Sequence, residues 1–148
     1  MTALKEYITQ HDIPAEHIQF SQSCHSVAEA AAAVGVDEHV FVKNICMIGD
    51  GLIVAIVKGE DRASTSRVAK AIGRERPRIA TPEEIQELTG YPCGGTPSFG
   101  FDATFLVDPR VMELPEVYTG GGSQTSLVKI STEELLKANN GQVVRVRK

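Results

Sequence analysis

The sequence predicts a single mixed α/β domain, and three observations lead to that prediction. The chain has 148 residues, a length typical of one domain with a sizeable core. Helix-like and strand-like segments alternate along it, without a linker or an internal repeat. Its strongest β signal is an antiparallel hairpin of residues 39–48 and 52–58 around a Gly-Asp-Gly turn. We therefore expect one mixed, mostly antiparallel, barrel-like sheet with surrounding helices, over residues 1–148.

Five segments have the signals of helices. Residues 3–11 carry apolar side chains at helical spacing. In the other four, a Ser or Thr that can cap the start is followed by a Gly or Asn that can end the helix. In 81–90 the cap is followed by Pro82 and Glu84, the pattern of a capping box with proline in the first turn. These four segments are 26–35, 64–73, 81–90 and 131–140.

The remaining periodic segments indicate strands. Short runs rich in β-branched and aromatic residues occupy 103–107, 116–119 and 126–130. A final run at 143–146 predicts one more strand. Because these strands are interleaved with helices, the sheet is expected to contain parallel as well as antiparallel pairs.

Charge and hydropathy exclude several classes of protein. The net charge is -4 and the pI is about 5.6, which argues against a general DNA-coating role. No apolar run approaches the roughly 18 residues that cross a bilayer, and no signal peptide is evident at the amino terminus. We expect no DNA or membrane partner.

Cysteine and histidine usage argues against a metal site or a disulfide framework. The three cysteines, Cys24, Cys46 and Cys93, contain no Cys-x-x-Cys pair, and none of the four histidines has a His-x-x-x-His partner. An odd number of dispersed cysteines is typical of a reducing cytoplasm. We therefore expect a cytoplasmic protein that uses no metal and no cofactor.

Lys43 is unusual for its position in a strand. Alternation places it on one face with Phe41, Ile45 and Met47, and both faces of 39–48 are largely apolar. A lysine there either lies near the strand end and extends to water or faces an anion in a pocket. The spacing alone leaves both interpretations open.

Two glycine-rich segments and a group of basic residues are the other candidate sites. In the loop that contains Cys93-Gly94-Gly95-Thr96-Pro97, adjacent glycines leave backbone N–H groups uncovered, although an isolated loop of this kind is more often a surface turn. Gly120-Gly121-Gly122 is not followed by the Lys of a P-loop. Seven of the fifteen basic residues lie between Lys58 and Arg78, which is consistent with a solvated helix face or an RNA-docking patch.

Taken together, these segments resemble the YbaK/ProX family, the prolyl-tRNA editing domain superfamily. The matching pieces are Val42-Lys43-Asn44, Thr89-Gly90-Tyr91, Gly94-Gly95-Thr96-Pro97 with Phe99-Gly100-Phe101, Val107-Asp108, and the glycines 120–122 leading to Ser126-Leu127. They cover roughly residues 25 to 146. Cys93 stands where the family often has the first glycine of a Gly-x-x-x-Pro loop.

The resemblance implies hydrolysis of the ester of a mischarged tRNA in trans, most often cysteine or alanine on tRNA for proline. It implies catalytic roles for Lys43, Gly95 and Thr96, with Lys43 anchoring the terminal nucleotide and N–H groups near Gly95 and Thr96 holding the carbonyl oxygen. The implied partners are mischarged tRNA and an aminoacyl-tRNA synthetase, for a monomer or homodimer. Further site residues are expected to bind substrate (Gly94, Pro97, Gly121 and Ser126) or tRNA (Arg67, Lys70 and Arg74).

Two other functions compete with this interpretation. The sequence shows no obvious general base, which favours a non-catalytic module that binds a nucleotide, tRNA or protein. A hydrolase of small esters or amides is a third possibility. The pocket walls of an editing enzyme would select the amino acid by size, and Phe20, Phe41, Met47 and Phe99 are candidates for walls or for core.

Overall fold

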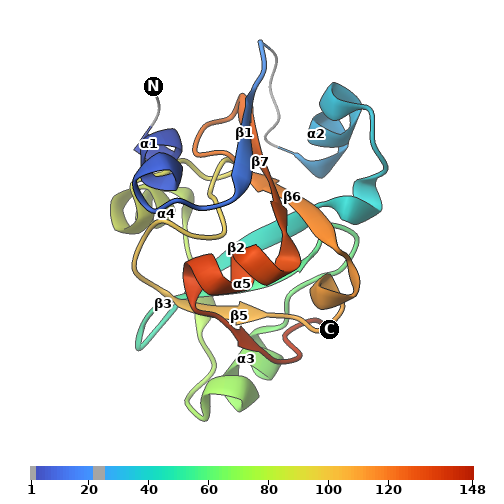
Figure 1. Ribbon diagram of the computed structural model, residues 1–148. Coiled ribbons are helices and arrows are strands. Elements are labelled where there is room, and N and C mark those ends of the chain that lie inside the picture. Colours follow the sequence, from blue (N-terminus) through green and yellow to red (C-terminus); the bar gives the residue numbers. More distant parts are fainter. Residues whose placement is uncertain (1–2, 22–25) are drawn as a thin grey trace.

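The computed structural model describes residues 3–21 and 26–148, which form two β-sheets with five α-helices around them (Figure 1). A three-stranded sheet has the order β1-β7-β6, and a five-stranded sheet has the order β4-β2-β3-β5-β8. The strands are β1 (Ala15–Gln19), β2 (Val42–Gly49), β3 (Gly51–Lys58), β4 (Arg78–Ile79), β5 (Thr104–Val107), β6 (Glu116–Gly120), β7 (Ser126–Ser131) and β8 (Gln142–Val143). The helices are α1 (Ala3–Gln10), α2 (Val27–Val34), α3 (Thr65–Ile72), α4 (Pro82–Thr89) and α5 (Thr132–Asn139).

The expected mixed, mostly antiparallel α/β domain is confirmed, although barrel-like describes it only loosely, because the strands form two sheets. The β3/β5 and β5/β8 pairs are parallel, and the other strand pairs are antiparallel. The two sheets are not closed into a barrel; an isolated bridge between Phe41 and Tyr118 links them. The outer strands of the large sheet, β4 and β8, have only two residues each, too few to continue the hydrogen bonding around a barrel.

The β2–β3 hairpin is confirmed, and it fixes the position of Lys43. In the hairpin, Lys43 is opposite Val57, and Gly49 is opposite Gly51. Gly51 has a φ of 90°, a backbone conformation that residues with a side chain rarely adopt. The strand begins later than the predicted residue 39, because Glu38–Val40 form a 3-10 turn. Asp37 caps that turn by accepting a hydrogen bond from the His39 N–H at 3.0 Å.

The helix boundaries follow the predicted caps. Ser26, Ser64, Thr81 and Ser131 each accept a hydrogen bond from the backbone N–H three residues later. Thr81 and Glu84 form the expected capping box. Every α-helix of the described ranges has eight residues, and none is long and apolar enough to span a membrane.

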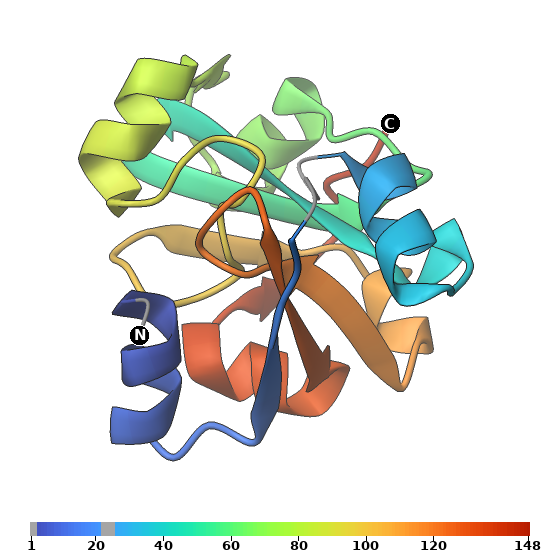
Figure 2. The same cartoon turned by 90° about the horizontal axis from the view of Figure 1, so that it is seen from above.

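Three groups of buried apolar residues hold the elements together. The main core lies between the two sheets and α5, and includes Phe99, Ile130 and Leu135. A second core lies between the large sheet and α3, around Val68. A third, smaller one lies under α2 and includes Phe41. Figure 2 shows α2 and α4 on either side of the centre, where the loops after α4 and β6 meet.

Candidate active site

A pocket of about 200 Å³ lies where the first half of β2 meets α2 and the two glycine-containing loops. Lys43, Gly94, Thr96 and Gly120 line it together, although they come from three distant parts of the sequence. The rest of the lining is mainly apolar and consists of Ser26, Val27, Ala30, Phe41, Val42, Asn44, Ile45, Ile85, Cys93, Thr119 and Leu127. The arrangement places one cation and exposed main chain inside an otherwise apolar cleft.

Lys43 is half-buried in this pocket. Burial lowers the pKa of its ammonium group from the usual 10.5, the positive charge of Arg62 lowers it further, and the negative charge of Asp61 opposes the change. No carboxylate of residues 3–21 or 26–148 forms an ion pair with Lys43. A partly desolvated ammonium without a paired carboxylate is suited to an anionic ligand such as a phosphate.

The loop after α4 presents main chain to the pocket, but not through the group that the sequence indicated. The Gly95 N–H donates to the Pro92 carbonyl at 3.0 Å, and the Thr96 hydroxyl donates to the same oxygen at 3.0 Å. Gly95 itself is buried and is absent from the lining. The backbone N–H groups of Gly94 and Thr96 have no acceptor within residues 3–21 and 26–148. The Cys93 N–H, at another lining residue of the loop, has no acceptor in these ranges either. The N–H groups of Gly94 and Thr96 are thus candidates to receive a carbonyl oxygen, whereas that of Gly95 is already used.

A buried polar network holds Thr96 in place. The Asn44 side-chain amide donates to the Thr96 carbonyl at 2.9 Å and to the Thr119 hydroxyl at 2.8 Å. The Ser98 hydroxyl donates to Asn44 Oδ1 at 2.6 Å and lies 2.7 Å from the Thr119 hydroxyl. Asn139 of α5 donates to the Ser98 carbonyl at 3.0 Å. The network thus ties β2, β6 and α5 to the loop and fixes the orientation of the Thr96 carbonyl.

The second glycine segment packs directly against the first. The Gly122 N–H donates to the Gly95 carbonyl at 2.8 Å, and a Cβ on Gly95 would lie 2.5 Å from the Ser123 carbonyl oxygen. A Cβ on Gly120 would collide with the Thr96 carbonyl. These close approaches exclude side chains, which is why both segments need glycine.

Three residues expected to touch substrate lie behind the pocket lining. Gly121 and Ser126 are buried, and the Gly121 N–H donates to the Ser126 carbonyl at 3.1 Å. Ser126 Oγ lies 2.6 Å from Ser123 Oγ, and His17 Nε2 lies 2.8 Å from the Gly121 carbonyl oxygen. Pro97 is also buried and does not line the pocket. Their contacts support the loops rather than form the pocket surface.

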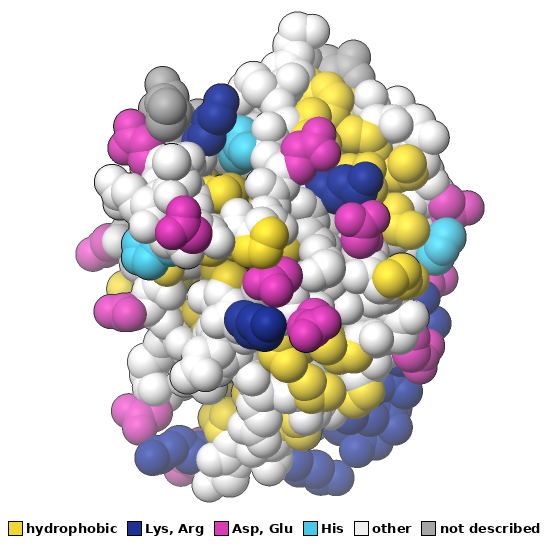
Figure 3. All heavy atoms as spheres, viewed as in Figure 1, with side chains coloured by type: hydrophobic (Ala, Val, Ile, Leu, Met, Phe, Trp, Pro, Cys, Tyr) yellow, Lys and Arg dark blue, Asp and Glu magenta, His cyan; other side chains and the backbone are white. Residues whose placement is uncertain are grey.

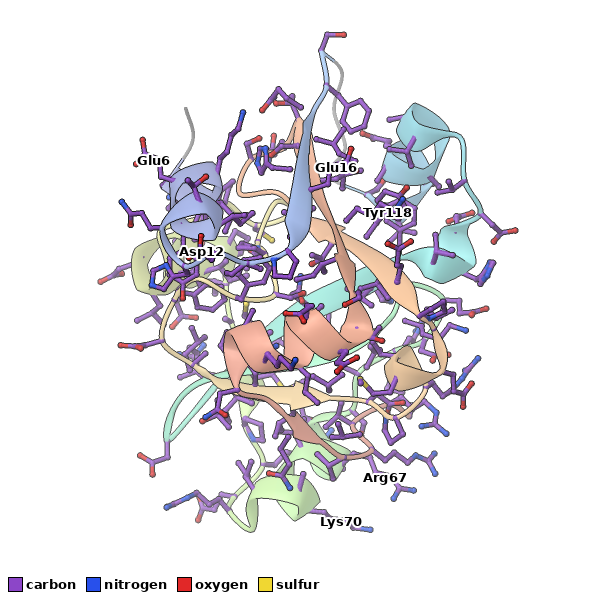
Figure 4. All side chains as sticks on the ribbon, in the orientation of Figure 1. Glu6, Asp12, Glu16, Arg67, Lys70 and Tyr118 are labelled. Atoms are coloured by element: carbon purple, nitrogen blue, oxygen red, sulfur yellow. The ribbon has the colours of Figure 1, made fainter. Side chains whose placement is uncertain are left out.

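The predicted RNA-contacting cations lie outside the pocket, on or just after α3. Figure 4 shows Arg67 and Lys70 at the lower edge of the molecule, with their side chains extending from α3. Arg74 pairs with Asp50 of the hairpin turn at 3.1 Å. α3 packs on the face of the large sheet that is opposite the main core.

Several site residues were not recognised from the sequence. Asn44 and Thr119 have no distinctive spacing and become a pair only through folding. Four apolar walls also went unrecognised, and their apolar spacing in helices and strands resembles that of ordinary core residues: Val27, Ala30, Ile85 and Leu127. Of the four aromatic or sulfur-containing wall candidates, Phe41 lines the pocket, whereas Met47 and Phe99 are core residues and Phe20 packs beside the third core.

The thiols differ in exposure. Cys93 is exposed and lines the pocket, whereas burial, with a smaller effect of Cys93, raises the pKa of Cys46 to about 11. Cys24 and His25 lie outside the described residues.

Within residues 3–21 and 26–148, no group of three or more His, Cys, Asp or Glu side chains is arranged to hold a metal ion.

Comparison with known proteins places this pocket in a family. The model of the aminoacyl-tRNA editing domain matches residues 21–138, which contain every residue of the pocket lining. The chain belongs to the aminoacyl-tRNA editing domain family.

Individual relatives cover most of this editing domain. The multifunctional Ser/Thr-tRNA deacylase ProXp-y of Escherichia coli is 29% identical over 133 residues, covering 84% of this chain and 78% of the relative. The proposed Cys-tRNA(Pro)/Cys-tRNA(Cys) deacylase EbsC of Enterococcus faecalis is 23% identical over 145 residues, covering 94% and 88%. A solved structure described as a proposed trans-editing enzyme for prolyl-tRNA synthetase has a TM-score of 0.88 and 26% identity, covering 100% of this chain and 99% of that one.

The geometry of the editing domain suits an ester substrate. Lys43 shares the pocket with Gly94 and Thr96, whose N–H groups have no acceptor in the described residues, and the rest of the lining is mainly apolar. This arrangement can hold a phosphate or ribose near the cation and polarise a carbonyl at the N–H groups.

Proposed function

We propose that this chain is an aminoacyl-tRNA deacylase that hydrolyses the ester between a small amino acid and the 3′ end of a mischarged tRNA, acting in trans. The relatives named above as tRNA deacylases support the reaction class. The observation that carries the proposal is the shared pocket of Lys43 with Gly94 and Thr96. We further propose that residues 1–148 act as a single editing domain.

In the proposed mechanism, Lys43 anchors the terminal nucleotide at a phosphate or near the ribose. The N–H groups of Gly94 and Thr96 donate hydrogen bonds to the carbonyl oxygen as it becomes negative. Water adds to the carbonyl carbon, and the bond from that carbon to the ribose oxygen then breaks, releasing the amino acid and the tRNA hydroxyl. Because the ester is already activated, holding the water and stabilising the oxyanion can supply most of the rate acceleration.

The proposal includes no protein general base. A ribose hydroxyl or the amine of the substrate, or a backbone carbonyl of the site, would orient the water. Gly95 contributes by placing the Thr96 peptide, and Pro97, Gly121 and Ser126 contribute by supporting the loops. These roles replace the direct substrate contacts expected from the sequence.

Pocket size supports selection of a small amino acid. The walls from α2, α4 and β7 are apolar, and the volume of about 200 Å³ also has to receive part of the nucleotide. We propose cysteine or alanine on tRNA for proline as the substrate, with larger side chains rejected sterically.

The proposed partners are mischarged tRNA and, by transient association, an aminoacyl-tRNA synthetase. The proposed tRNA contacts expected from the sequence are Arg67 and Lys70 of α3 and Arg74 just after it. We place the enzyme in the cytoplasm, where charged tRNAs are used in translation, and propose that it is a monomer or homodimer.

A panel of tRNA(Pro) charged with cysteine, alanine or proline tests the function, with loss of the ester followed over time. The wild-type chain should deacylate a small-residue substrate and spare prolyl-tRNA. Lys43→Ala should lower kcat/KM by about 100-fold or more, because it removes a contact to the bound nucleotide and a charge near the reacting ester.

The matched control is Lys137→Ala, which removes an exposed lysine of α5. It should retain full activity, and both variants should keep the wild-type far-UV circular dichroism spectrum. Full activity of Lys43→Ala would remove the assigned role. Failure of the wild-type chain on every ester, with tRNA binding intact, would favour a binding module instead.

A further inference from the structure

A group of basic side chains surrounds the segment that follows β8. The Lys148 N–H donates to the Arg62 carbonyl at 2.8 Å, Ala63 and Arg147 form a β-bridge, and the Ser64 N–H donates to the Val146 carbonyl at 2.7 Å. Residues 144–148 are therefore attached to the 62–64 segment that leads into α3. These two segments and the first turn of α3 carry five cations, of which Arg147 pairs with Asp108. We define the basic strip as the other four: Arg62, Arg67, Arg145 and Lys148.

A buried carboxylate fixes the strip in place. Asp108 is fully buried and accepts hydrogen bonds from the Val146 N–H at 3.0 Å and the Arg147 N–H at 3.1 Å. The Arg147 guanidinium donates to it at 2.9 Å. Backbone N–H donors of this kind hold a segment in a defined position, so Arg145 and Lys148 are displayed on a fixed backbone.

The acidic groups near the strip already have cationic partners. Glu60 pairs with Lys58 at 2.9 Å, Asp61 pairs with Arg110 at 2.6 Å, and Asp108 pairs with Arg147. No ion pair to a member of the basic strip forms within residues 3–21 and 26–148. The strip therefore has an uncompensated positive charge on an acidic protein, which favours a polyanionic ligand.

The strip begins close to the candidate active site, because Lys43 is opposite Val57 near the end of β3, and Arg62 follows four residues after that strand ends. Arg62 is close enough to Lys43 for its charge to lower the pKa of Lys43. By contrast, Arg74 pairs with Asp50, which is seven residues from Lys43 along the hairpin, about 23 Å at roughly 3.3 Å per residue. Figure 3 shows Lys and Arg side chains gathered at the lower right edge, and Figure 4 shows Arg67 and Lys70 at the lower edge.

We propose that Arg62, Arg67, Arg145 and Lys148 bind the phosphate backbone of the tRNA acceptor stem while Lys43 holds the terminal nucleotide. The inference rests on the proposed deacylase function and extends it to the duplex part of the substrate. Because these cations would contact phosphates and not base edges, the binding should be independent of the tRNA sequence and should weaken as the salt concentration rises. The strip thereby adds affinity for a complete tRNA without changing the chemistry at the ester.

The test measures binding of an uncharged tRNA(Pro) transcript by fluorescence anisotropy between 50 and 200 mM salt, roughly the range over which phosphate contacts weaken strongly. The double variant Arg145→Gln/Lys148→Gln should bind about 10-fold or more weakly at low salt. Its plot of log affinity against log salt should lose about 2 units of slope, because each phosphate contact contributes about 1.

The charge-matched control is Lys129→Gln/Lys137→Gln, which removes the same charge from β7 and α5. Its affinity and slope should stay close to wild type. Equal losses in the two double variants would show that net charge, rather than the strip, attracts RNA. An unchanged slope for Arg145→Gln/Lys148→Gln, or no tRNA binding by the wild-type chain at 50 mM salt, also overturns the proposal.

A second substrate separates this inference from the proposed function. A CCA trinucleotide esterified with alanine has the reacting end but no duplex. Arg145→Gln/Lys148→Gln should lose kcat/KM only on full-length alanyl-tRNA(Pro), and equal losses on both substrates contradict the strip. If neither substrate is hydrolysed by the wild-type chain, the deacylase proposal fails, while the anisotropy result still decides whether the strip binds RNA.

Discussion

At the scale of single residues, the glycines of the site are required by space. A Cβ on Gly95 would lie 2.5 Å from the Ser123 carbonyl oxygen, and one on Gly121 would lie 2.5 Å from the Leu127 nitrogen. Both obstacles are main-chain atoms, which cannot rotate away as a flexible side chain can. From the sequence, glycine was interpreted as a way to expose backbone N–H groups. In the structure, these glycines are needed because the two glycine segments pack too closely against neighbouring main chain to leave room for a Cβ atom.

We expect Gly95→Ala to destabilise the protein by about 1–3 kcal/mol, because the added methyl group overpacks a rigid contact. For a domain of this size, that change lowers Tm by about 3–10 °C. Deacylation should also fall, since the loop that carries Thr96 has to move. Thermal unfolding followed by circular dichroism provides the measurement. The control is Cys93→Ala at the exposed neighbouring position, which should leave Tm unchanged; an equally stable Gly95→Ala protein would contradict the packing argument.

The charge state of Lys43 gives a second prediction at this scale. Its folded pKa lies below 10.5 mainly because of burial and then because of Arg62, so the ammonium group costs folding free energy at neutral pH. That cost declines as pH rises through the folded pKa. Titration of Lys43 Nζ by NMR should show a higher pKa in Arg62→Gln and a lower one in Asp61→Asn. Shifts of the opposite sign would show that these charges do not act on Lys43 as described.

At the scale of elements, one side-chain network joins two strands, a helix and a loop. Asn44 supplies both amide hydrogens, and Ser98 and Thr119 complete the contacts. The Thr96 carbonyl is held by the Asn44 amide, and both Asn44 and Thr119 also line the pocket. The network therefore connects packing of β2 against β6 to the position of the proposed oxyanion donor.

We expect Asn44→Ala to destabilise the fold by about 1–3 kcal/mol, because it leaves buried hydroxyl and carbonyl groups with fewer partners. Asn44→Asp keeps an acceptor for Ser98 but loses both donors, so its kcat should fall as well, by about 10-fold or more if the Thr96 peptide turns. Stability comes from urea unfolding and kcat from alanyl-tRNA(Pro) hydrolysis. Wild-type kcat in Asn44→Asp would show that the network does not position the loop.

The elements also show what the sequence could and could not predict. The caps at Ser64, Thr81 and Ser131 are local, so the helix starts were predicted correctly. Strand β1 was missed because Ala15–Gln19 has little β propensity and is held by its pairing with β7, more than a hundred residues later. The predicted strand 143–146 is shorter, since Asp108 draws the Val146 N–H away from the sheet.

The candidate site shows the same division between residues with a local sequence signal and residues whose role arises only from tertiary contacts. Lys43 was identified because a lysine in an apolar strand is anomalous within its own segment, and Gly94 and Thr96 because adjacent glycines are a local signal. Asn44 and Thr119 gave no such signal, because their roles arise from tertiary contacts. Gly121 and Ser126 were placed in the right neighbourhood, but the sequence did not show that they lie behind the lining.

At the scale of the whole molecule, Asp108 connects the end of β5 to the last residues described. Burial opposes its charge, but hydrogen bonds from the backbone N–H groups of Arg110, Val146 and Arg147, with the Arg147 charge, lower the pKa of the carboxyl group. The lowered pKa means that this carboxylate stabilises the fold above its unfolded pKa, near 3.9. The stabilisation is lost as pH falls through the lower, folded pKa.

We expect Asp108→Asn to cost about 3–5 kcal/mol at pH 7, because the Arg147 guanidinium and three backbone N–H groups lose a charged acceptor. The difference from wild type should shrink as the pH is lowered below about 4, because the Asp108 carboxylate of the unfolded chain is protonated there before the native one, and it should level off below the folded pKa. Urea unfolding at a series of pH values measures it. A difference that stays constant down to pH 2, or one that grows in acid, would contradict this account of Asp108.

The contact between the two glycine segments has a consequence for how such enzymes diversify. The proposed polarising groups are backbone N–H groups, so a point mutation at Gly94 or Thr96 does not replace them directly, and most changes can act only through neighbours such as Gly95 or Asn44. The walls contributed by Val27, Ala30 and Ile85 are ordinary side chains on short helices. We therefore expect related proteins to acquire new amino-acid preferences through those helices while keeping one reaction chemistry.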